Sequence, residues 1–175
     1  MSKIEQAIIR DDDRRPEPPK LCAWLASVAI VPLIIVSQFL PRGSNPVLRG
    51  AGVFVLLLAG VFIFVPFYLL AKYGGKGGQI YMQGSAVVDR GLYAITRHPQ
   101  YFGYILRACG CALLSQHWVA LLLAVVGATF FYLQAAREEE YCLARFGTPY
   151  EQYLRRVPRF NLVLGMIRLL RGDEE

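Results

Sequence analysis

Four apolar runs constrain the fold of this chain more than any other feature of its sequence. They cover residues 21–40, 47–71, 99–115 and 119–136. About 20 apolar residues of helix are needed to cross the hydrocarbon core of a bilayer, so the runs predict four transmembrane helices, the third somewhat short. With 55% hydrophobic residues, the chain is too apolar for an ordinary small soluble domain. We therefore expect an all-α, polytopic membrane helix bundle.

Positive charge is unevenly distributed around these runs. The segments 1–20, 72–98 and 137–175 carry 5, 4 and 7 of the 19 Lys and Arg residues, whereas the segment 41–50 carries 2. Cytoplasmic loops are enriched in Lys and Arg, so both termini are expected in the cytoplasm, at a bacterial inner membrane or the endoplasmic reticulum. A net charge of +6 on a soluble protein would suggest nucleic-acid binding, but here it indicates a basic membrane face and no nucleic-acid partner.

The two ends of the chain differ from its centre. Residues 1–20 combine three aspartates with a proline-rich stretch, which is unlike a secretory signal peptide and predicts a cytosolic tail. Residues 21–160 are expected to form the membrane domain. In residues 161–175, apolar groups alternate with Arg168 and Arg171, which predicts a helix on the cytosolic membrane surface followed by an acidic tail.

Two polar clusters lie against apolar runs, where ionisable groups are costly and usually have a function. One occupies residues 97–103 and the other residues 137–140. The runs 99–115 and 119–136 are joined by a tight turn, so they should form an antiparallel hairpin. This hairpin would bring the two clusters together on the same side of the membrane.

The first cluster has the chemistry of an anion site. Pro99 predicts that a helix begins there, with His98 as its capping residue. The free amides of that helix, beside Arg97 and His98, would suit a carboxylate or a phosphate. The alternative is a purely structural role, in which His98 only caps the helix. In the second cluster, consecutive residues of a helix face different ways, so only one or two of residues 138–140 can enter the site.

Several short motifs in the C-terminal half come in the order and at the spacing of one family. They are Gly91-Leu92-Tyr93, Arg97-His98-Pro99, Tyr101, Gly103, Glu138-Glu139, Phe146-Gly147, Tyr150, Tyr153 and Val157-Pro158-Arg159. Over about residues 84–160 the sequence resembles the isoprenylcysteine carboxyl methyltransferase and phospholipid methyltransferase group of integral-membrane enzymes. The resemblance implies a membrane methyltransferase domain that uses S-adenosylmethionine as methyl donor.

The charges of the two clusters match those of this donor. Arg97 or His98, with the nearby helix amides, is expected to bind the carboxylate of its methionine portion. Glu138 or Glu139 is expected to bind the ammonium group or a ribose hydroxyl. All four are therefore candidate cofactor-binding residues.

Two further candidates for cofactor binding lie in the first turns of the third run. Tyr101 is expected to pack against the sulfonium, because an aromatic face attracts a positive charge. Gly103, which has no side chain, would let the adenosine portion approach the helix closely.

The methyl acceptor is expected to be lipidic, with the carboxylate of a prenylated cysteine as the leading hypothesis. A phospholipid amine and a thiol stay open as alternatives. Arg107, inside the third run, is the candidate catalytic residue for orienting an anionic acceptor; a structural ion pair or snorkelling is the competing interpretation. Phe146-Gly147 predicts a helix end, and Tyr150 and Tyr153 are interpreted as interface anchors rather than site residues.

Two other functions compete with methyl transfer. Membrane sterol reductases, which use NADPH, share the Arg-His-Pro signature, and Cys142 fits their pattern. They usually have Asn where this chain has Gln100, and they are longer, with more spans. The second competitor is a non-enzymatic membrane scaffold. No metal is expected, because Cys109 and Cys111 lack the spacing of a zinc site.

Overall fold

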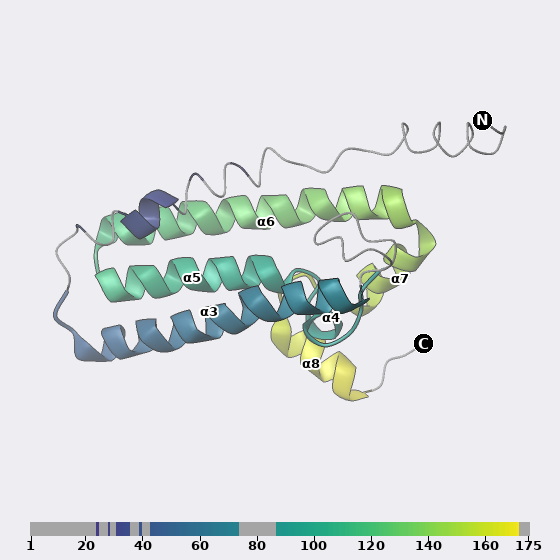
Figure 1. Ribbon diagram of the computed structural model, residues 1–175, viewed down its shortest axis with the longest axis horizontal. Helices are drawn as coiled ribbons and strands as arrows, with labels where there is room; N and C mark the ends of the chain where they lie inside the picture. The colour runs from purple at the N-terminus through teal and green to yellow at the C-terminus, as the bar shows by residue number, and fades with distance from the viewer. Residues whose placement is uncertain are drawn as a thin grey trace.

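The structure is a computed structural model that describes residues 24, 28, 31–35, 39, 43–73 and 87–171 (Figure 1). The helices within these ranges are α3 (Pro46–Tyr73), α4 (Leu92–Ile95), α5 (Pro99–Ser115), α6 (Trp118–Phe146), α7 (Thr148–Arg156) and α8 (Leu162–Arg171). Every regular element in the described ranges is an α-helix, so the predicted all-α class is confirmed. The predicted tails at 1–20 and 172–175 lie outside the described residues.

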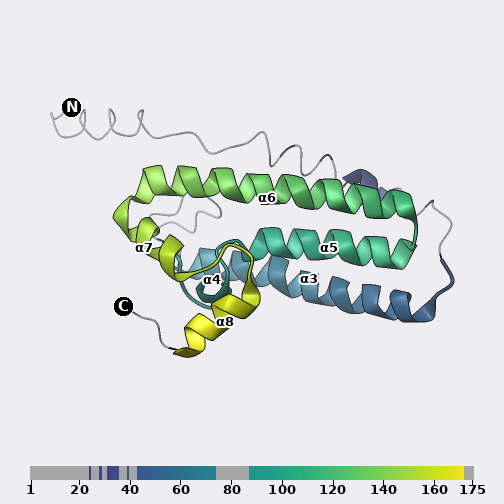
Figure 2. The ribbon, with the colours of Figure 1, turned by 180° about the vertical axis from the view of Figure 1, so that it is seen from behind.

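The three longest helices lie side by side. Figures 1 and 2, which show the molecule from opposite sides, both place α5 between α3 and α6. Only α3 and α6 are, by length and composition, able to cross a membrane among the described helices. Their most apolar stretches are just 17% and 33% buried, far less than in a core helix of a soluble protein. Apolar side chains that do not pack inside the protein are suited to contact lipid.

The other two predicted spans are less complete. The 17 residues of α5 agree with the predicted bounds and are short for a span, as expected. Of the predicted helix at 21–40 only a few residues are described, all of them helical. One of these, Leu33, is 1% exposed and packs in a cluster with Ala108 of α5 and Ala124 of α6. The four-span topology stays a prediction.

Glycines set the distance between α3 and α5. A Cβ atom on Gly103 would lie 2.9 Å from the backbone carbonyl carbon of Phe62, and one on Gly110 would lie 3.2 Å from the carbonyl oxygen of Gly52. Small residues allow such close backbone contact between membrane helices. Beside Gly103, the rings of Phe62 and Phe102 meet edge to face at 5.1 Å.

The predicted hairpin of α5 and α6 is confirmed. At its tip, Gln116 adopts a left-handed conformation with φ 52°, which reverses the chain. The His117 side chain then accepts a hydrogen bond from the Val119 amide and caps α6. The Gln116 side-chain amide accepts a hydrogen bond from the Asn45 amide and donates one to the Asn45 carbonyl oxygen. These two bonds fix the loop before α3. His117 therefore has a structural role far from the polar clusters.

The predicted end of the fourth apolar run is wrong as a helix boundary. The helix α6 continues ten residues past 136, so the acidic cluster lies within it rather than beyond it. The helix ends at Gly147, whose φ of 60° favours glycine, and the predicted stop at Phe146-Gly147 is confirmed. Within this extension, Glu138 and Glu139 have partners outside the helix, described below.

The helix α7 corrects a second expectation. Tyr150 and Tyr153 are 6% and 5% exposed and pack with Val157 in a small core, so they are not anchors at an exposed membrane interface. The Tyr153 hydroxyl donates a hydrogen bond of 2.7 Å to the carbonyl oxygen of Tyr93. The two tyrosines thus join α7 to the segment that leads into α5.

The last described helix, α8, crosses α4. Gly165 lies directly against the carbonyl oxygen of Ile95, where no side chain would fit. Arg168 donates to the carbonyl oxygens of Arg155 and Arg156, which are free at the end of α7. The apolar residues Val163 and Leu170 stay exposed on the other side of the helix. The structure has a helix in the predicted C-terminal segment, and its place on the membrane surface stays a prediction.

Candidate functional site

The site is built around His98, at the beginning of α5. Its backbone angles, φ −124° and ψ 60°, lie outside the helical region, as expected for a residue before proline. Pro99 is the first residue of the helix, and the His98 side chain makes no capping hydrogen bond. The imidazole instead lies 3.1 Å from Glu139, between its Nε2 atom and Oε1. His98 is therefore the N-cap residue of α5, as predicted, but its side chain does not cap the helix.

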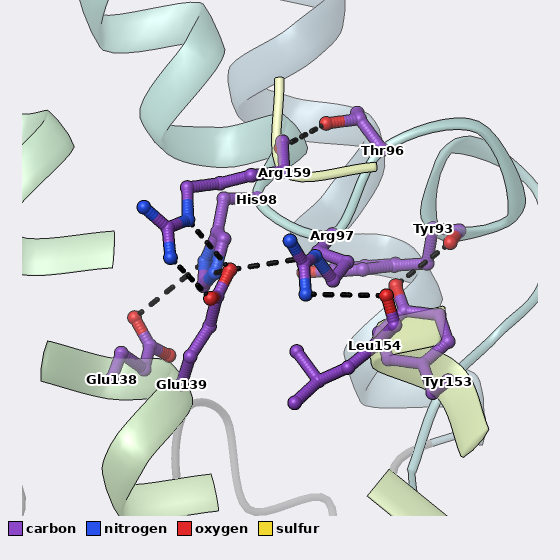
Figure 3. A network of polar contacts seen from close by, with 9 residues as sticks. All are labelled: Tyr93, Thr96, Arg97, His98, Glu138, Glu139, Tyr153, Leu154 and Arg159. Carbon is purple, nitrogen blue, oxygen red and sulfur yellow. Dashed lines mark hydrogen bonds and ion pairs between the residues drawn. The ribbon is translucent and has the colours of Figure 1, made fainter. Parts of the chain in front are cut away.

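The carboxylate of Glu139 is the hydrogen-bond acceptor at the centre of the site. Its carboxylate receives two hydrogen bonds from Arg159, at 2.9 Å from Nε to Oε1 and 2.5 Å from Nη2 to Oε2. The Nε atom of Arg97 lies 3.4 Å from Oε1. Figure 3 shows the two guanidinium groups on opposite sides of this carboxylate, with His98 also in contact. A carboxylate with 9% of its side chain exposed needs such partners, since burying an unpaired charge is costly.

The neighbours of Glu139 on α6 face in different directions, as predicted. Glu138 reaches the other side of the imidazole, with its Oε2 atom 3.9 Å from Nδ1 of His98. Glu140 is exposed. Tyr101, 4% exposed, stacks on His98 with ring centroids 5.6 Å apart. Glu138 and Glu139 therefore enter the site, and Glu140 does not.

The segment 157–161 closes the site from the C-terminal side. The Thr96 hydroxyl donates a hydrogen bond of 2.6 Å to the carbonyl oxygen of Arg159. The Arg97 amide donates to the carbonyl oxygen of Pro158 at 3.0 Å. Because the backbones on both sides are joined, the Arg159 side chain is held at a fixed place beside α6 (Figure 3).

Two pKa shifts follow from this packing. The hydrogen bonds to Glu139 raise the pKa of Arg159 above its usual value, so its guanidinium is charged at any physiological pH. Burial raises the pKa of Tyr153 well above its usual value, because an ionised phenol would lose its hydration there. Tyr153 is therefore a neutral hydrogen-bond donor that supports the loop before His98.

The structure brings together five of the residues that the sequence predicts to bind the cofactor. They are Arg97, His98, Tyr101, Glu138 and Glu139. Gly103 faces the backbone of α3, which gives it a packing function; its predicted contact with a cofactor stays a prediction.

Arg107 lies apart from this cluster. It comes eight residues after Pro99, about 12 Å along the axis of α5. Its guanidinium carbon is 5.4 Å from the ring centroid of Tyr104, and its Nε atom is buried without a hydrogen-bond partner. Among the described residues, no carboxylate lies within ion-pair distance of it. A structural ion pair therefore does not account for Arg107 within this part of the chain.

Arg159 belongs to one of the motifs quoted for the family resemblance, but it was not assigned to the site from the sequence. A signal exists, because a carboxylate beside a membrane span needs a cationic partner. Four arginines follow Glu139 before the end of α7 or just after it: Arg145, Arg155, Arg156 and Arg159. Sequence spacing does not show which of these arginines pairs with Glu139. The backbone hydrogen bonds of the segment 157–161 place Arg159 there.

The exposed apolar helices and the charged cluster at one end of them define a helical membrane protein with a polar site. Comparison with known sequences then identifies the family. Residues 48–149, more than half of the chain, match the phospholipid methyltransferase family. The chain belongs to this family, which agrees with the predicted resemblance.

Two curated relatives carry the same kind of name. The chain is 40% identical over 73 residues to a protein-S-isoprenylcysteine O-methyltransferase of Schizosaccharomyces pombe, covering 41% of this chain and 31% of the relative. It is 37% identical over 73 residues to protein-S-isoprenylcysteine O-methyltransferase B of Arabidopsis thaliana, covering 41% of this chain and 37% of the relative. The aligned segment thus spans about a third of the length of each relative. No solved structure matches the chain.

Proposed function

We propose that this protein is an integral-membrane methyltransferase that transfers a methyl group from S-adenosylmethionine to a lipidic acceptor, foremost the carboxylate of an S-prenylated cysteine. The family and the names of the two relatives support this proposal. The observation that carries it is the set of charges around Glu139, where a buried carboxylate lies between two guanidinium groups. We place this end of the helices at the cytoplasmic side, because Lys and Arg are concentrated there.

The residues present fit the amino-acid portion of S-adenosylmethionine. That portion carries a carboxylate and an ammonium group, so it requires a cation and an anion side by side. The buried Nε atom of Arg97 makes no hydrogen bond and only an ion pair of 3.4 Å with Glu139, and the first amides of α5 are free of partners within the helix. These groups would bind the carboxylate. Glu139, or Glu138 beside it, would bind the ammonium group or a ribose hydroxyl.

The rings of His98 and Tyr101 would form an aromatic wall of the donor site. Tyr101 stacks on His98 and also on Phe131 of α6, at 5.8 Å between centroids, so its position is fixed. Such a face attracts the positive charge of a sulfonium. When bound, S-adenosylmethionine supplies an electrophilic methyl group with a neutral thioether as leaving group.

The protein's own contribution to such a displacement is alignment and exclusion of water. A carboxylate acceptor attacks as the anion and needs no general base, whereas an amine or a thiol must first lose a proton. Both ring nitrogens of His98 face the carboxylates of Glu138 and Glu139, so neither nitrogen is directed at an acceptor from which it could take a proton. The site thus favours an acceptor that is already anionic, although a phospholipid amine and a thiol stay open.

The decisive experiment measures the binding of S-adenosylhomocysteine and of NADPH to the detergent-purified protein. Wild type is compared with His98→Ala, Glu139→Ala and the control Glu140→Ala, whose exposed side chain lies one residue from the site. We expect binding of S-adenosylhomocysteine that the first two substitutions weaken at least about 10-fold, since each removes a charge-assisted contact, and that the control does not change. Binding of NADPH instead would support a reductase, and binding of neither to folded protein would support a scaffold.

A further inference from the structure

We propose that Arg159 binds the carboxylate of the methyl acceptor, while Arg97 serves the methyl donor. This inference rests on the proposed function and divides the two guanidinium groups of the site between the two substrates. The division follows from where each group points, how far it is exposed and what surrounds it.

Arg97 faces the inside of the protein. One of its terminal nitrogens donates to the carbonyl oxygen of Leu154 in α7, and 13% of its side chain is exposed. Arg159 lies on the opposite side of Glu139, with 27% of its side chain exposed (Figure 3). Its guanidinium carbon is 5.2 Å from the ring centroid of Tyr132, which is half exposed on α6. Of the two arginines, Arg159 is therefore the one that an incoming molecule can reach.

The surface that leads to Arg159 is apolar and belongs to a membrane-crossing helix. Tyr132 and Glu139 are seven residues apart, about two turns, so they share one face of α6. Between Glu139 and the N-terminus of α6, the exposed residues on that face are Trp118, Leu121, Val125 and Tyr132. A lipid tail lying along this face would end with its polar head at Arg159. Phe160, whose ring is 6.0 Å from that of Tyr132, continues the apolar wall on the loop side.

The charges around Arg159 allow a second anion to bind. Arg159 uses Nε and Nη2 for Glu139 and also interacts with the Tyr132 hydroxyl at the exposed side of the site, where a carboxylate could replace that neutral partner. Two guanidinium groups flank Glu139, whereas Glu138 lies toward His98 and has no ion pair with either arginine. Arginine is suited to this task because its planar donors match a carboxylate and its charge is permanent. An S-prenylated cysteine offers both parts, an apolar tail and a terminal carboxylate.

The reaction itself would change this contact. A carboxylate oxygen forms a bond to the methyl carbon as the bond from sulfur to that carbon breaks, and the electron pair of the broken bond stays on sulfur. The acceptor loses its negative charge and the sulfonium loses its positive charge. The resulting methyl ester no longer attracts Arg159, so the same residue that binds the acid releases the product.

The test compares Arg159→Gln and Arg159→Lys with the control Arg156→Gln, since Arg156 is exposed and pairs with Asp89 away from the site. Methylation of N-acetyl-S-farnesylcysteine is measured in detergent. We expect the KM for this acceptor to rise about 10- to 100-fold in Arg159→Gln, the range of a lost charged hydrogen bond, with partial recovery in Arg159→Lys and no change in the control. Binding of S-adenosylhomocysteine should stay close to wild type, because Glu139 keeps Arg97 and His98 as partners.

A second readout separates binding of the acceptor from a purely structural role of Arg159. The carboxamide of N-acetyl-S-farnesylcysteine, which lacks the charge, is used as a competitor beside the carboxylate. Wild type should bind the carboxylate more tightly, and Arg159→Gln should lose that preference. A variant that keeps the preference, or loses binding of S-adenosylhomocysteine to the same extent as the acceptor, overturns the inference. Wild type that binds no S-adenosylhomocysteine would instead refute the proposed function itself.

Discussion

Replacement of Gly103 by alanine tests whether this glycine serves helix packing or the cofactor. The new Cβ atom would lie 2.9 Å from the carbonyl carbon of Phe62 and 3.0 Å from the amide nitrogen of Ile63. Both are backbone atoms, so α3 and α5 must move apart. Overpacking of this kind costs about 1–3 kcal/mol, while alanine gains about 1 kcal/mol over glycine within a helix.

A matched control removes the second of these effects. Gly60 lies in the interior of α3, and a Cβ atom there would have no neighbour within 4 Å. Gly60→Ala should therefore show only the gain in helix propensity. We expect Gly103→Ala to be about 1–3 kcal/mol less stable than Gly60→Ala, the whole difference arising from the contact with α3.

Both variants are unfolded chemically in the same detergent, and their affinity for S-adenosylhomocysteine is measured by calorimetry under native conditions. The packing argument predicts a loss of stability in Gly103→Ala. Equal stability of the two variants, combined with lost ligand affinity in Gly103→Ala, would refute it and assign the glycine to the cofactor.

Three further substitutions test the connections around the site. Glu139→Ala leaves three cationic or ionisable partners without their carboxylate and should lower the free energy of unfolding by about 3–5 kcal/mol. Glu140→Ala, at an exposed position, should change the free energy of unfolding by less than about 0.5 kcal/mol. Equal effects of the two substitutions would contradict the geometry of the site. Tyr153→Phe removes only the hydrogen bond to Tyr93 and should cost about 1 kcal/mol in the same unfolding assay; no measurable loss would mean that the bond does not support the loop. Gly165→Leu places a side chain against the carbonyl oxygen at the end of α4 and should speed amide hydrogen exchange throughout α8, while unchanged exchange would show that the crossing adapts.

The hairpin of α5 and α6 shows what the sequence alone predicts well. The apolar run at 99–115, which begins with Pro99, determines the bounds of α5, because proline fixes the first turn and the αL residue Gln116 ends the last. Two helices joined by so short a turn must be antiparallel, so the meeting of the two polar clusters follows from topology, and the structure shows it as the contact between His98 and Glu139 across 41 residues. This part of the site needed no knowledge of side-chain packing.

The errors have a common physical cause. Hydrophobicity predicts where a helix leaves the hydrocarbon core, not where its hydrogen bonds end, and α6 therefore continues past residue 136 to Gly147. Composition likewise suggests that Tyr150 and Tyr153 lie at an interface, but burial depends on the return of α7 toward Tyr93. The role of Arg159 depends on the same return of the chain, which no local pattern reports.

The site takes one of its charges from a late part of the chain. Arg159 is synthesised 20 residues after Glu139, whereas Arg97 and His98 precede it. A nascent chain in which α3, α5 and α6 have formed therefore has the Glu139 carboxylate without its bidentate partner Arg159. The carboxylate acquires that partner only when α7 has formed and the segment 157–161 has paired with residues 96 and 97. During biogenesis, the complete site should thus form after α6 has been made, as a separate folding step.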